Sequence, residues 1–307
     1  MDWLTRMKAS LVYIENNLTG EIDHEELAKI ACCSSYNFRR TFSFITDISL
    51  SEYIRRRRLT LAALELQSGD AKVIDLAVKY GYDSPVSFSR AFQALHGVTP
   101  TDARLDGAAL KAYPRISFQI SIKGDTEMDY RIETKEGFQV YGVEEIFNED
   151  VGLPSIMGTD TSDAGHRKPS DLWEDSLENG MHQKLEDSAG ELPAFVGSEL
   201  SKVHAVCDYR ETGEGTFPYM LCAFNTQSSD TGGFTIVDIP AHTWAIFPSG
   251  NVKWDDFGDT IGNMYKRFFT EWIPTSEYEQ VGSLDMELYG GDDEHGYVEL
   301  WFAVQKK

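Results

Sequence analysis

The sequence predicts two folded parts of different class, an all-α N-terminal domain over residues 1–111 and an α+β C-terminal domain over residues 112–307. The first prediction rests on an internal repeat, in which Phe38–Phe42 (FRRTF) is matched fifty positions later by Phe88–Phe92 (FSRAF). The second rests on a change near residue 110, where apolar residues pass from helical spacing to alternation. A chain of 307 residues is long enough for two such domains.

Each copy of the repeat has the pattern of two helices joined by a tight turn. The first helix, near residues 27–30 or 73–80, is apolar on one face. The turn that follows contains a serine or aspartate suited to an N-cap, and Pro85 suits a first helical turn. The second helix pairs two phenylalanines, four positions apart, with an exposed polar face. This is the helix-turn-helix layout, whose second helix is the recognition helix in DNA-binding proteins.

Between the two copies, Ser51 to Leu66 predicts one long helix with four consecutive arginines, Arg55–Arg58, near its start. After the first recognition helix, Asp47 stands where the second copy has Gly97. Because aspartate enters the left-handed backbone region more readily than most residues, we expect the helix to end normally there.

This part of the chain resembles the DNA-binding domain of the AraC/XylS transcription regulators over about residues 5–107. The matching positions are Phe38 to Phe42, Tyr53 to Arg55, Arg58, Leu59, Ile74 to Ala77, Gly81, Tyr82, Ser87 to Phe92, Gly97 to Pro100 and Arg104. The resemblance implies sequence-specific binding to double-stranded DNA, with RNA polymerase as a further partner. The alternative is a plain seven-helix bundle without a nucleic-acid role.

The two recognition helices differ in sequence, so an asymmetric promoter site is expected, with the helices in major-groove segments about 34 Å apart. The candidate DNA contacts are Ser35, Tyr36, Asn37, Arg39 and Arg40 in the first helix and Val86, Ser87, Ser89 and Arg90 in the second. Arginine suits guanine through two donors, whereas Val86 offers only an apolar contact, for instance to a thymine methyl group.

Charge divides the chain. Residues 1–111 contain 14 basic and 14 acidic residues, and the remaining 196 contain 14 basic and 36 acidic, so the net charge of −22 lies entirely in the second part. DNA binding therefore requires a local basic face, which Arg39, Arg40, Arg55–Arg58 and Arg90 can supply. The acidic part is expected to be a solvated surface, a field that attracts cationic ligands, or both, since the two are compatible.

Other classes of site find little support in the composition. Nothing runs apolar for the length of a membrane span, and the start, Met1 to Ser10, lacks the pattern of a signal peptide. The four cysteines form no disulfide framework, and the seven histidines form no metal-ligand cluster. We therefore expect a cytoplasmic protein without a membrane partner, a metal or a cofactor.

The second part alternates strands with single helices, which predicts an α+β domain. Strands are expected at residues 116–122, 130–134, 138–147, 203–209, 219–224, 234–239, 242–248, 283–289 and 297–304, and helices at 169–185 and 254–272. From Tyr130 onward this order is strand, strand, helix, strand, strand, given twice. It indicates a duplicated β-α-β-β arrangement with a groove between the halves.

This arrangement resembles the GyrI-like effector-binding domain found in several multidrug-responsive regulators, over about residues 112–307. The residues that carry the resemblance are Phe138 to Val143, Asp171 to Trp173, Ile239 to Ala245 with Phe247, Trp272 to Pro274 with Tyr278 and Glu279, Met286 to Tyr289 and Leu300 to Val304. Together with the N-terminal part, it implies a Rob-like regulator whose C-terminal domain binds a small effector.

Alternation along the last two strands suggests where the effector binds. We expect the faces that carry Glu287 and Tyr289, and Tyr297, Glu299 and Trp301, to look together into the groove, away from the helices. A carboxylate among aromatic rings suits a lipophilic cation, and the resemblance implies this role for Glu287. The candidate ligand-binding residues are Glu287, Tyr289, Trp301, Tyr297, Trp173 and Trp244. Alternatively, Glu287 faces solvent and the tryptophans fill the core.

A function of another class is also compatible with this site. Some members of the GyrI-like superfamily hydrolyse small electrophilic compounds, and Glu287 with Tyr289 or Trp301 would supply the necessary groups. We expect no catalytic residues, because a sensor gains little from destroying its signal.

Overall fold

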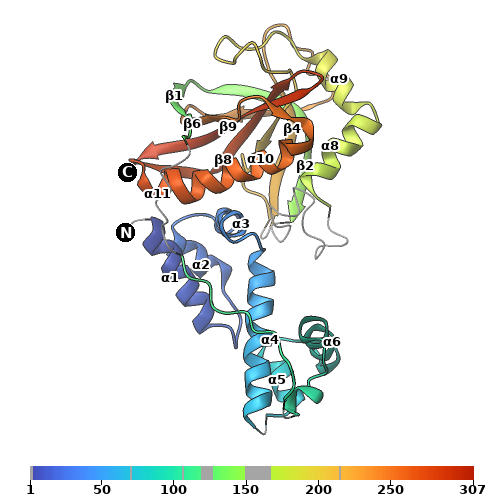
Figure 1. Cartoon of the computed structure of the whole chain (residues 1–307). Helices are drawn as coiled ribbons and strands as arrows, with labels where there is room; N and C mark the ends of the chain where they lie inside the picture. The colour runs from blue at the N-terminus through green and yellow to red at the C-terminus, as the bar shows by residue number, and fades with distance from the viewer. Residues whose placement is uncertain (1–2, 70, 106, 119–126, 149–166, 214–215) are drawn as a thin grey trace. The chain divides into compact units, whose positions relative to one another are not determined.

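The computed structural model describes residues 3–69, 71–105, 107–118, 127–148, 167–213 and 216–307 (Figure 1). The chain divides into two compact units. The first contains Met1–Ser35 and Leu50–Gln119, and the second contains Tyr36–Ser49 and Ile120–Lys307. The first recognition helix, α3 (Ser35–Thr46), therefore belongs almost wholly to the second unit. Within the described ranges, no helix is long and apolar enough to cross a membrane.

The first unit is helical, as predicted. Its elements are α1 (Trp3–Asn16), α2 (His24–Ala31), α4 (Leu50–Ser68), α5 (Val73–Lys79), α6 (Pro85–His96) and a short 3-10 turn, η1 (Asp102–Arg104). The second recognition helix, α6, begins at Ser84, whose hydroxyl accepts a hydrogen bond from the Ser87 amide at 3.1 Å, and ends at Gly97 with φ +82°. The two phenylalanines of its repeat, Phe88 and Phe92, are fully buried against α4 and α5. The repeat pattern thus gave both ends and the buried face of this helix.

The arginine run at the start of α4, Arg55–Arg58, makes ion pairs and hydrogen bonds within the first unit. The first two side chains pair with Glu52, the third lies 2.9 Å from a carboxylate oxygen of Glu15, and the fourth donates to the carbonyls of residues 18 and 20. These contacts are internal to the first unit. Arg57 links α4 to α1, whereas Arg55 and Arg56 pair within α4 and stay partly exposed, so the contribution of this run to a basic DNA-binding face stays a prediction.

The segment after the helices continues along the first unit. The Tyr113 amide donates to Thr60 Oγ1 at 3.1 Å, and the Ile116 amide donates to the Tyr53 hydroxyl at 3.3 Å. The strand expected at residues 116–122 is absent from its described part, residues 116–118, and the remainder lies outside the described residues. The described part of this segment is held by backbone amides that donate to side chains of α4.

A nine-stranded antiparallel sheet forms the centre of the second unit. Its strands are β1 (Arg131–Lys135), β2 (Phe138–Asn148), β3 (His204–Cys207), β4 (Thr216–Phe224), β5 (Thr235–Ile239), β6 (His242–Pro248), β7 (Val252–Lys253), β8 (Tyr278–Gly291) and β9 (His295–Lys306). The order across the sheet is β1-β6-β9-β8-β3-β4-β2-β5, with β7 paired to β9.

The predicted duplication is present in this order. Each half has two strands, a helical segment and two strands, with the two-residue β7 added before α10 in the second half. The halves meet where β3 pairs with β8, with Ala205 opposite Glu287. The first strand of each half crosses to the other half, because β1 pairs with β6 and β5 pairs with β2. The two halves therefore interlock into one sheet.

The helices differ from the expected ones in their details. The helix expected at 169–185 is two, α8 (Pro169–Glu178) and α9 (Met181–Ser188), because Gly180 between them has φ +76°. The helix expected at 254–272 is α10 (Trp254–Arg267) followed by a π-helical turn, η2 (Phe268–Trp272), and by α11 (Ile273–Thr275). After α3, Asp47 has φ +59°, as predicted from its alignment with Gly97.

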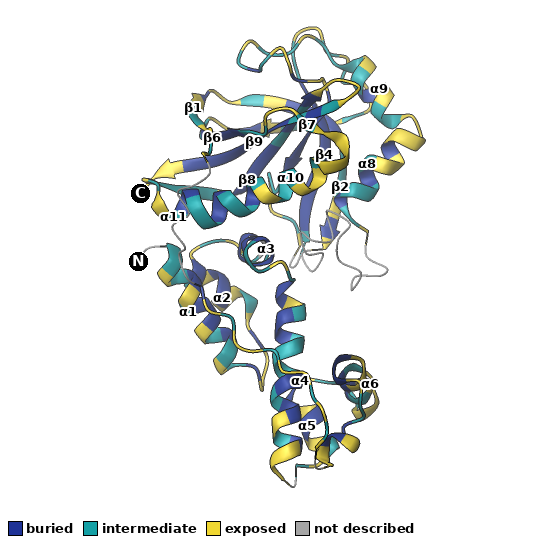
Figure 2. Cartoon of the chain, in the orientation of Figure 1, coloured by how far each residue is buried: buried dark blue, intermediate teal, exposed yellow. Residues whose placement is uncertain are grey.

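The sheet is covered on both faces, so the central strands β3 and β4 are buried over nearly their whole length, and β8 and β9 are buried mainly in their middle (Figure 2). On one face, called here the helix face, side chains of β3, β4 and β2 pack against α8 and α9, and Phe302 of β9 stacks on Phe268 of η2 with ring centroids 3.7 Å apart. On the opposite face, Trp244 and Trp301 lie in a core closed by Val196 and Leu200 from the segment before β3.

Candidate functional site: an acid–tyrosine cluster on the helix face

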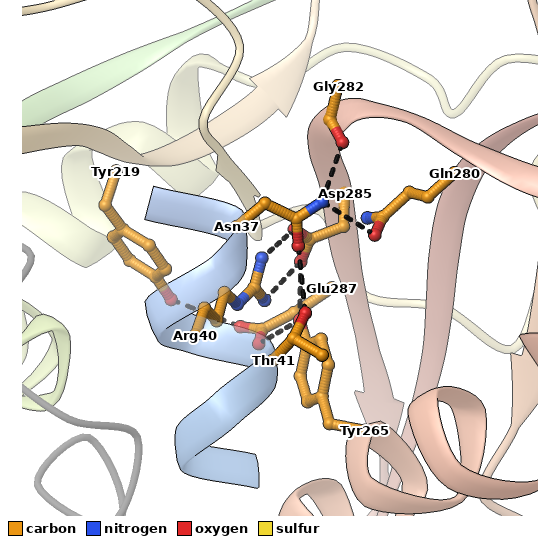
Figure 3. Close-up of polar contacts among 9 residues, drawn as sticks. All are labelled: Asn37, Arg40, Thr41, Tyr219, Tyr265, Gln280, Gly282, Asp285 and Glu287. Atoms are coloured by element: carbon orange, nitrogen blue, oxygen red, sulfur yellow. Dashed lines mark hydrogen bonds and ion pairs between the residues drawn. The ribbon is translucent and has the colours of Figure 1, made fainter. Parts of the chain in front are cut away.

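Two carboxylates and three tyrosines meet on the helix face near the centre of the sheet. Figure 3 draws both carboxylates and two of the tyrosines, Tyr219 and Tyr265. We call Asp285, Glu287, Tyr219, Tyr265 and Tyr289 the acid–tyrosine cluster. The two carboxylates alternate along β8, Tyr219 comes from β4, and Tyr265 comes from α10. The strands and the helix thus converge on one site.

Glu287 is the centre of the hydrogen bonding. Its Oε2 accepts from the hydroxyls of Tyr289 at 2.6 Å and Tyr219 at 3.3 Å, and its Oε1 lies 2.9 Å from the Tyr265 hydroxyl. Trp173 of α8 donates its indole N–H to the Tyr219 hydroxyl at 2.9 Å, and its ring meets the Tyr289 ring edge-on. Burial raises the pKa of the Glu287 carboxyl, against the lowering effect of these hydroxyls.

The Tyr265 hydroxyl lies between the two carboxylates of the cluster. It lies 2.6 Å from Asp285 Oδ2 and 2.9 Å from Glu287 Oε1, yet it has one proton and donates to one carboxylate at a time. Two ionised carboxylates sharing one donor in a buried site repel each other. A proton on Glu287 or a cation in the cluster removes that repulsion.

One cation is already present, from α3. The Arg40 guanidinium binds Asp285 through both terminal nitrogens, with Nη2 2.8 Å from Oδ2, and its carbon lies 4.7 Å from the centre of the Tyr265 ring. Both side chains of this ion pair are almost fully buried. With both carboxylates ionised and Arg40 in place, the cluster would still have one net negative charge.

The neighbouring Asp208 also responds to this crowding. Burial raises its pKa to about 6, and the nearby carboxylate of Asp285 acts in the same direction, whereas a hydrogen bond from Ser283 and the charge of Arg40 oppose the rise. A raised carboxyl pKa stabilises the folded state below pH about 3.8, and this contribution is lost as pH rises through about 6.

The first prediction follows from this sign. Asp208→Asn should raise the melting temperature at pH 8, by an amount that corresponds to about 1 kcal/mol, because it removes a charge that the folded state disfavours. At pH 4 the same change should have little effect. Thermal unfolding followed by circular dichroism at both pH values measures the difference, and a larger stabilisation at pH 4 than at pH 8 would contradict the assignment.

The structure corrects the expected composition of the site. In the antiparallel pair β8 and β9, Glu287 lies opposite Leu300 and Met286 opposite Trp301. Odd-numbered residues of β8 therefore share a face with even-numbered residues of β9. The prediction that Glu287 and Tyr289 face the same side as Tyr297, Glu299 and Trp301 was wrong, and so was the expectation that they point away from the helices. The prediction assigned the faces of each strand from its own apolar residues and did not include the register between the two strands, which decides which residues share a face.

Three of the six predicted ligand-binding residues, Trp244, Tyr297 and Trp301, therefore lie on the opposite face of the sheet from Glu287. Trp244 and Trp301 are fully buried on the opposite face, with ring centroids 5.8 Å apart. Tyr297 and Trp301 both donate to Glu299, which also pairs with Arg131 at 2.7 Å. The other three, Glu287, Tyr289 and Trp173, do come together.

The predicted DNA contacts divide by helix. Asn37 and Arg40 of α3 are only 6% and 7% exposed, and Arg39 is half-buried. The backbone of Tyr36 belongs to α3, but its side chain lies outside the described residues. In α6, Val86, Ser87 and Arg90 are exposed. The fourth candidate of this helix, Ser89, is half-buried, and its hydroxyl donates to the Pro85 carbonyl. The second recognition helix thus presents its candidate residues to solvent.

Sequence reasoning missed three members of the cluster. Asp285 shares the strand face of Glu287 and was visible in the alternation, but its position carried no motif. Tyr265 belongs to the apolar stripe of α10, where its ring packs on Phe302, and only the fold brings its hydroxyl to β8. Tyr219 lies on β4, which no pattern in the sequence pairs with β8 through β3.

Comparison with known proteins agrees with this architecture. Residues 131–304 match the family model described as integron-associated effector binding protein. The chain belongs to this family. Residues 27–105 match a helix-turn-helix domain model, so both resemblances predicted from the sequence are confirmed. This chain joins an AraC-type DNA-binding domain to an effector-binding domain, and it is a DNA-binding transcription regulator.

Three proteins are similar to parts of this chain. The transcriptional activator AarP of Providencia stuartii is 42% identical over 95 residues, which are 31% of this chain and 70% of AarP. The regulatory protein SoxS of Escherichia coli K12 is 34% identical over 94 residues, which are 31% of this chain and 88% of SoxS. The integron cassette protein of Vibrio cholerae, a solved structure, has 16% identity and a TM-score of 0.36, covering 57% of this chain and 95% of its own.

Proposed function

We propose that this transcription regulator is controlled by a small lipophilic cation that binds at the acid–tyrosine cluster. The observation that carries the proposal is the buried Glu287, which accepts hydrogen bonds from tyrosines and lies beside an Asp285 already bound to a guanidinium. A buried carboxylate persists in its charged form only if it is hydrogen-bonded or paired with a cation. Aromatic rings around it add area and cation–π attraction.

Titration calorimetry with a rigid aromatic cation tests this function. Tetraphenylphosphonium supplies the charge and the rings, and triphenylphosphine oxide supplies similar rings without the charge. We expect the full chain to bind the cation more tightly than the neutral compound. Equal affinities would remove the electrostatic basis of the proposal, and failure to bind either compound would remove the cluster as an effector site.

The DNA-binding half of the proposal rests on the exposed face of α6. Arg90→Ala should weaken binding to a duplex selected with the wild-type chain by about 1–3 kcal/mol if Arg90 contacts a base. A base contact also predicts altered preference at one position of the site, whereas a phosphate contact lowers affinity uniformly. Lys79→Ala, which removes an exposed cation of α5 that pairs with Glu65, is the control. Unchanged affinity in the Arg90 variant would exclude either contact.

The hydrolase alternative is less well supported. AarP and SoxS are transcription regulators by name. Glu287 does have the raised pKa that a general base requires. Recovery of an electrophilic ester unchanged after long incubation with the full chain would exclude hydrolysis, and its steady consumption, abolished by Glu287→Gln, would establish it.

A further inference from the structure

The residues of α3 that face the acid–tyrosine cluster are also predicted to contact DNA. Asn37 Nδ2 lies 3.2 Å from Gln280 Oε1 and 3.0 Å from the Gly282 carbonyl, at an irregularity in β8. Arg40 is bound to Asp285. Because the Asn37 amide and the Arg40 guanidinium donate to groups of β8, they are unable to donate to a base edge at the same time. The conformation seen here is therefore one in which neither residue is available to DNA.

The contact is specific rather than a chance surface pairing. Asn37, Arg40 and Phe44 follow helical spacing and form one face of α3. The Phe44 ring stacks on Tyr265 with centroids 4.5 Å apart and lies 5.8 Å from Phe269. This face thus combines an amide, a guanidinium and an aromatic ring, and each finds a matching partner in β8 or α10. Figure 3 draws the contacts of the amide and the guanidinium.

Arg40 occupies the cluster much as a lipophilic cation would. Its guanidinium is flat, delocalised and weakly hydrated, which makes it suited to a buried site. It contacts a carboxylate at one edge and lies over an aromatic ring at its face. These are the same kinds of interaction that we propose for the effector at Glu287, which lies two residues from Asp285 on the same strand face, so the two cations would compete for one site.

We propose that Arg40 is an internal ligand of the effector site, and that an effector cation displaces it from Asp285 and so frees the first recognition helix for DNA. This inference rests on the proposed function, and it specifies that binding of the effector raises the affinity for DNA. By linkage, DNA that binds α3 must raise the affinity for the effector by the same factor. Because docked α3 occupies the site, part of the cation's binding energy is used to displace Arg40, which lowers its apparent affinity.

Hydrogen–deuterium exchange of the full wild-type chain tests the displacement directly. In the absence of DNA, saturating tetraphenylphosphonium should increase exchange in the peptide that covers residues 35–46, because α3 loses its contacts with β8 and α10. The peptide of α6, residues 85–96, is the internal control and should be unaffected. Bound cation with unchanged or slower exchange in α3 would overturn the proposal.

A pair of variants tests the energetic consequence. Asp285→Asn keeps the size of the side chain but removes the charge that holds Arg40, so affinity for the selected duplex without cation should rise about 5- to 150-fold. Asp47→Asn removes the same charge from the exposed pair between Asp47 and Lys266 and should change affinity less than about threefold. Equal effects of the two variants would show a general charge effect and overturn the proposal.

These outcomes separate the inference from the proposed function. If the wild-type chain binds neither the cation nor any duplex, the proposed function fails, and the inference fails with it. If it binds both, but α3 stays protected and Asp285→Asn behaves like its control, the proposed function survives and only the internal-ligand inference is lost. The exchange measurement uses the wild-type chain, so a variant that misfolds does not prevent a decision.

Discussion

Replacing Trp301 with alanine is expected to lower the free energy of unfolding by about 3–5 kcal/mol. Trp301 is fully buried on the face of the sheet opposite Glu287, where it packs on Trp244, and its indole N–H donates to Glu299 at 2.8 Å. Alanine would leave a cavity and remove one of the groups that satisfy a buried carboxylate. Urea unfolding followed by far-ultraviolet circular dichroism gives the change.

Trp254→Ala is a matched control for this variant. Trp254 is half exposed at the start of α10, and its indole N–H donates to the Asp292 carbonyl, so its loss should cost within about 1 kcal/mol. If Trp301→Ala instead left the unfolding curve unchanged and abolished cation binding, Trp301 would be a ligand contact, and the separation of the two faces would not describe the binding site.

Changing Glu287 to glutamine should weaken binding of tetraphenylphosphonium by about 2 kcal/mol or more, which is about 30-fold in Kd. Glutamine keeps the size and one accepting oxygen, and its NH2 group can donate to a tyrosine hydroxyl where the second carboxylate oxygen accepted, so the main change is the loss of charge. Affinity for triphenylphosphine oxide should stay nearly constant. Titration calorimetry on both compounds gives the two values.

Glu299→Gln provides the control, because it makes the same chemical change to a buried carboxylate on the opposite face. It should lower stability, since Arg131 loses its charged partner, without altering cation affinity. Equal losses for cation and neutral compound in the Glu287 variant would make Glu287 a residue of shape or folding. Equal cation losses in the two variants would place the effector away from the acid–tyrosine cluster.

Much of the fold could be predicted because its signals are local. The repeat around Phe38 and Phe88 shows both recognition helices, and Ser84 and Gly97 mark the ends of the second. The strand His242–Pro248 was predicted with its observed bounds, and Asp47 adopts the left-handed conformation expected from the repeat. Caps, turns and apolar periodicity depend on neighbours in sequence, so they can be found without tertiary structure.

The features that were missed depend on contacts between distant segments. The register of β8 against β9 decides which side chains join Glu287, and a shift by one residue reverses every face. Gly180 was compatible with a continuous helix until its positive φ was known. The pairing of Arg40 with Asp285 joins residues 245 positions apart. Arg40 was predicted to contact DNA and Asp285 was given no role, so nothing in the sequence connected the two.

The central claim is that a cation at the acid–tyrosine cluster controls how the chain binds DNA. It is tested most directly by fluorescence anisotropy titration of a selected duplex with the wild-type chain, with and without saturating tetraphenylphosphonium. The account predicts that the cation lowers the Kd for DNA by about 5- to 150-fold. A Kd that stays the same or rises, under conditions in which calorimetry shows the cation to be bound, would contradict it.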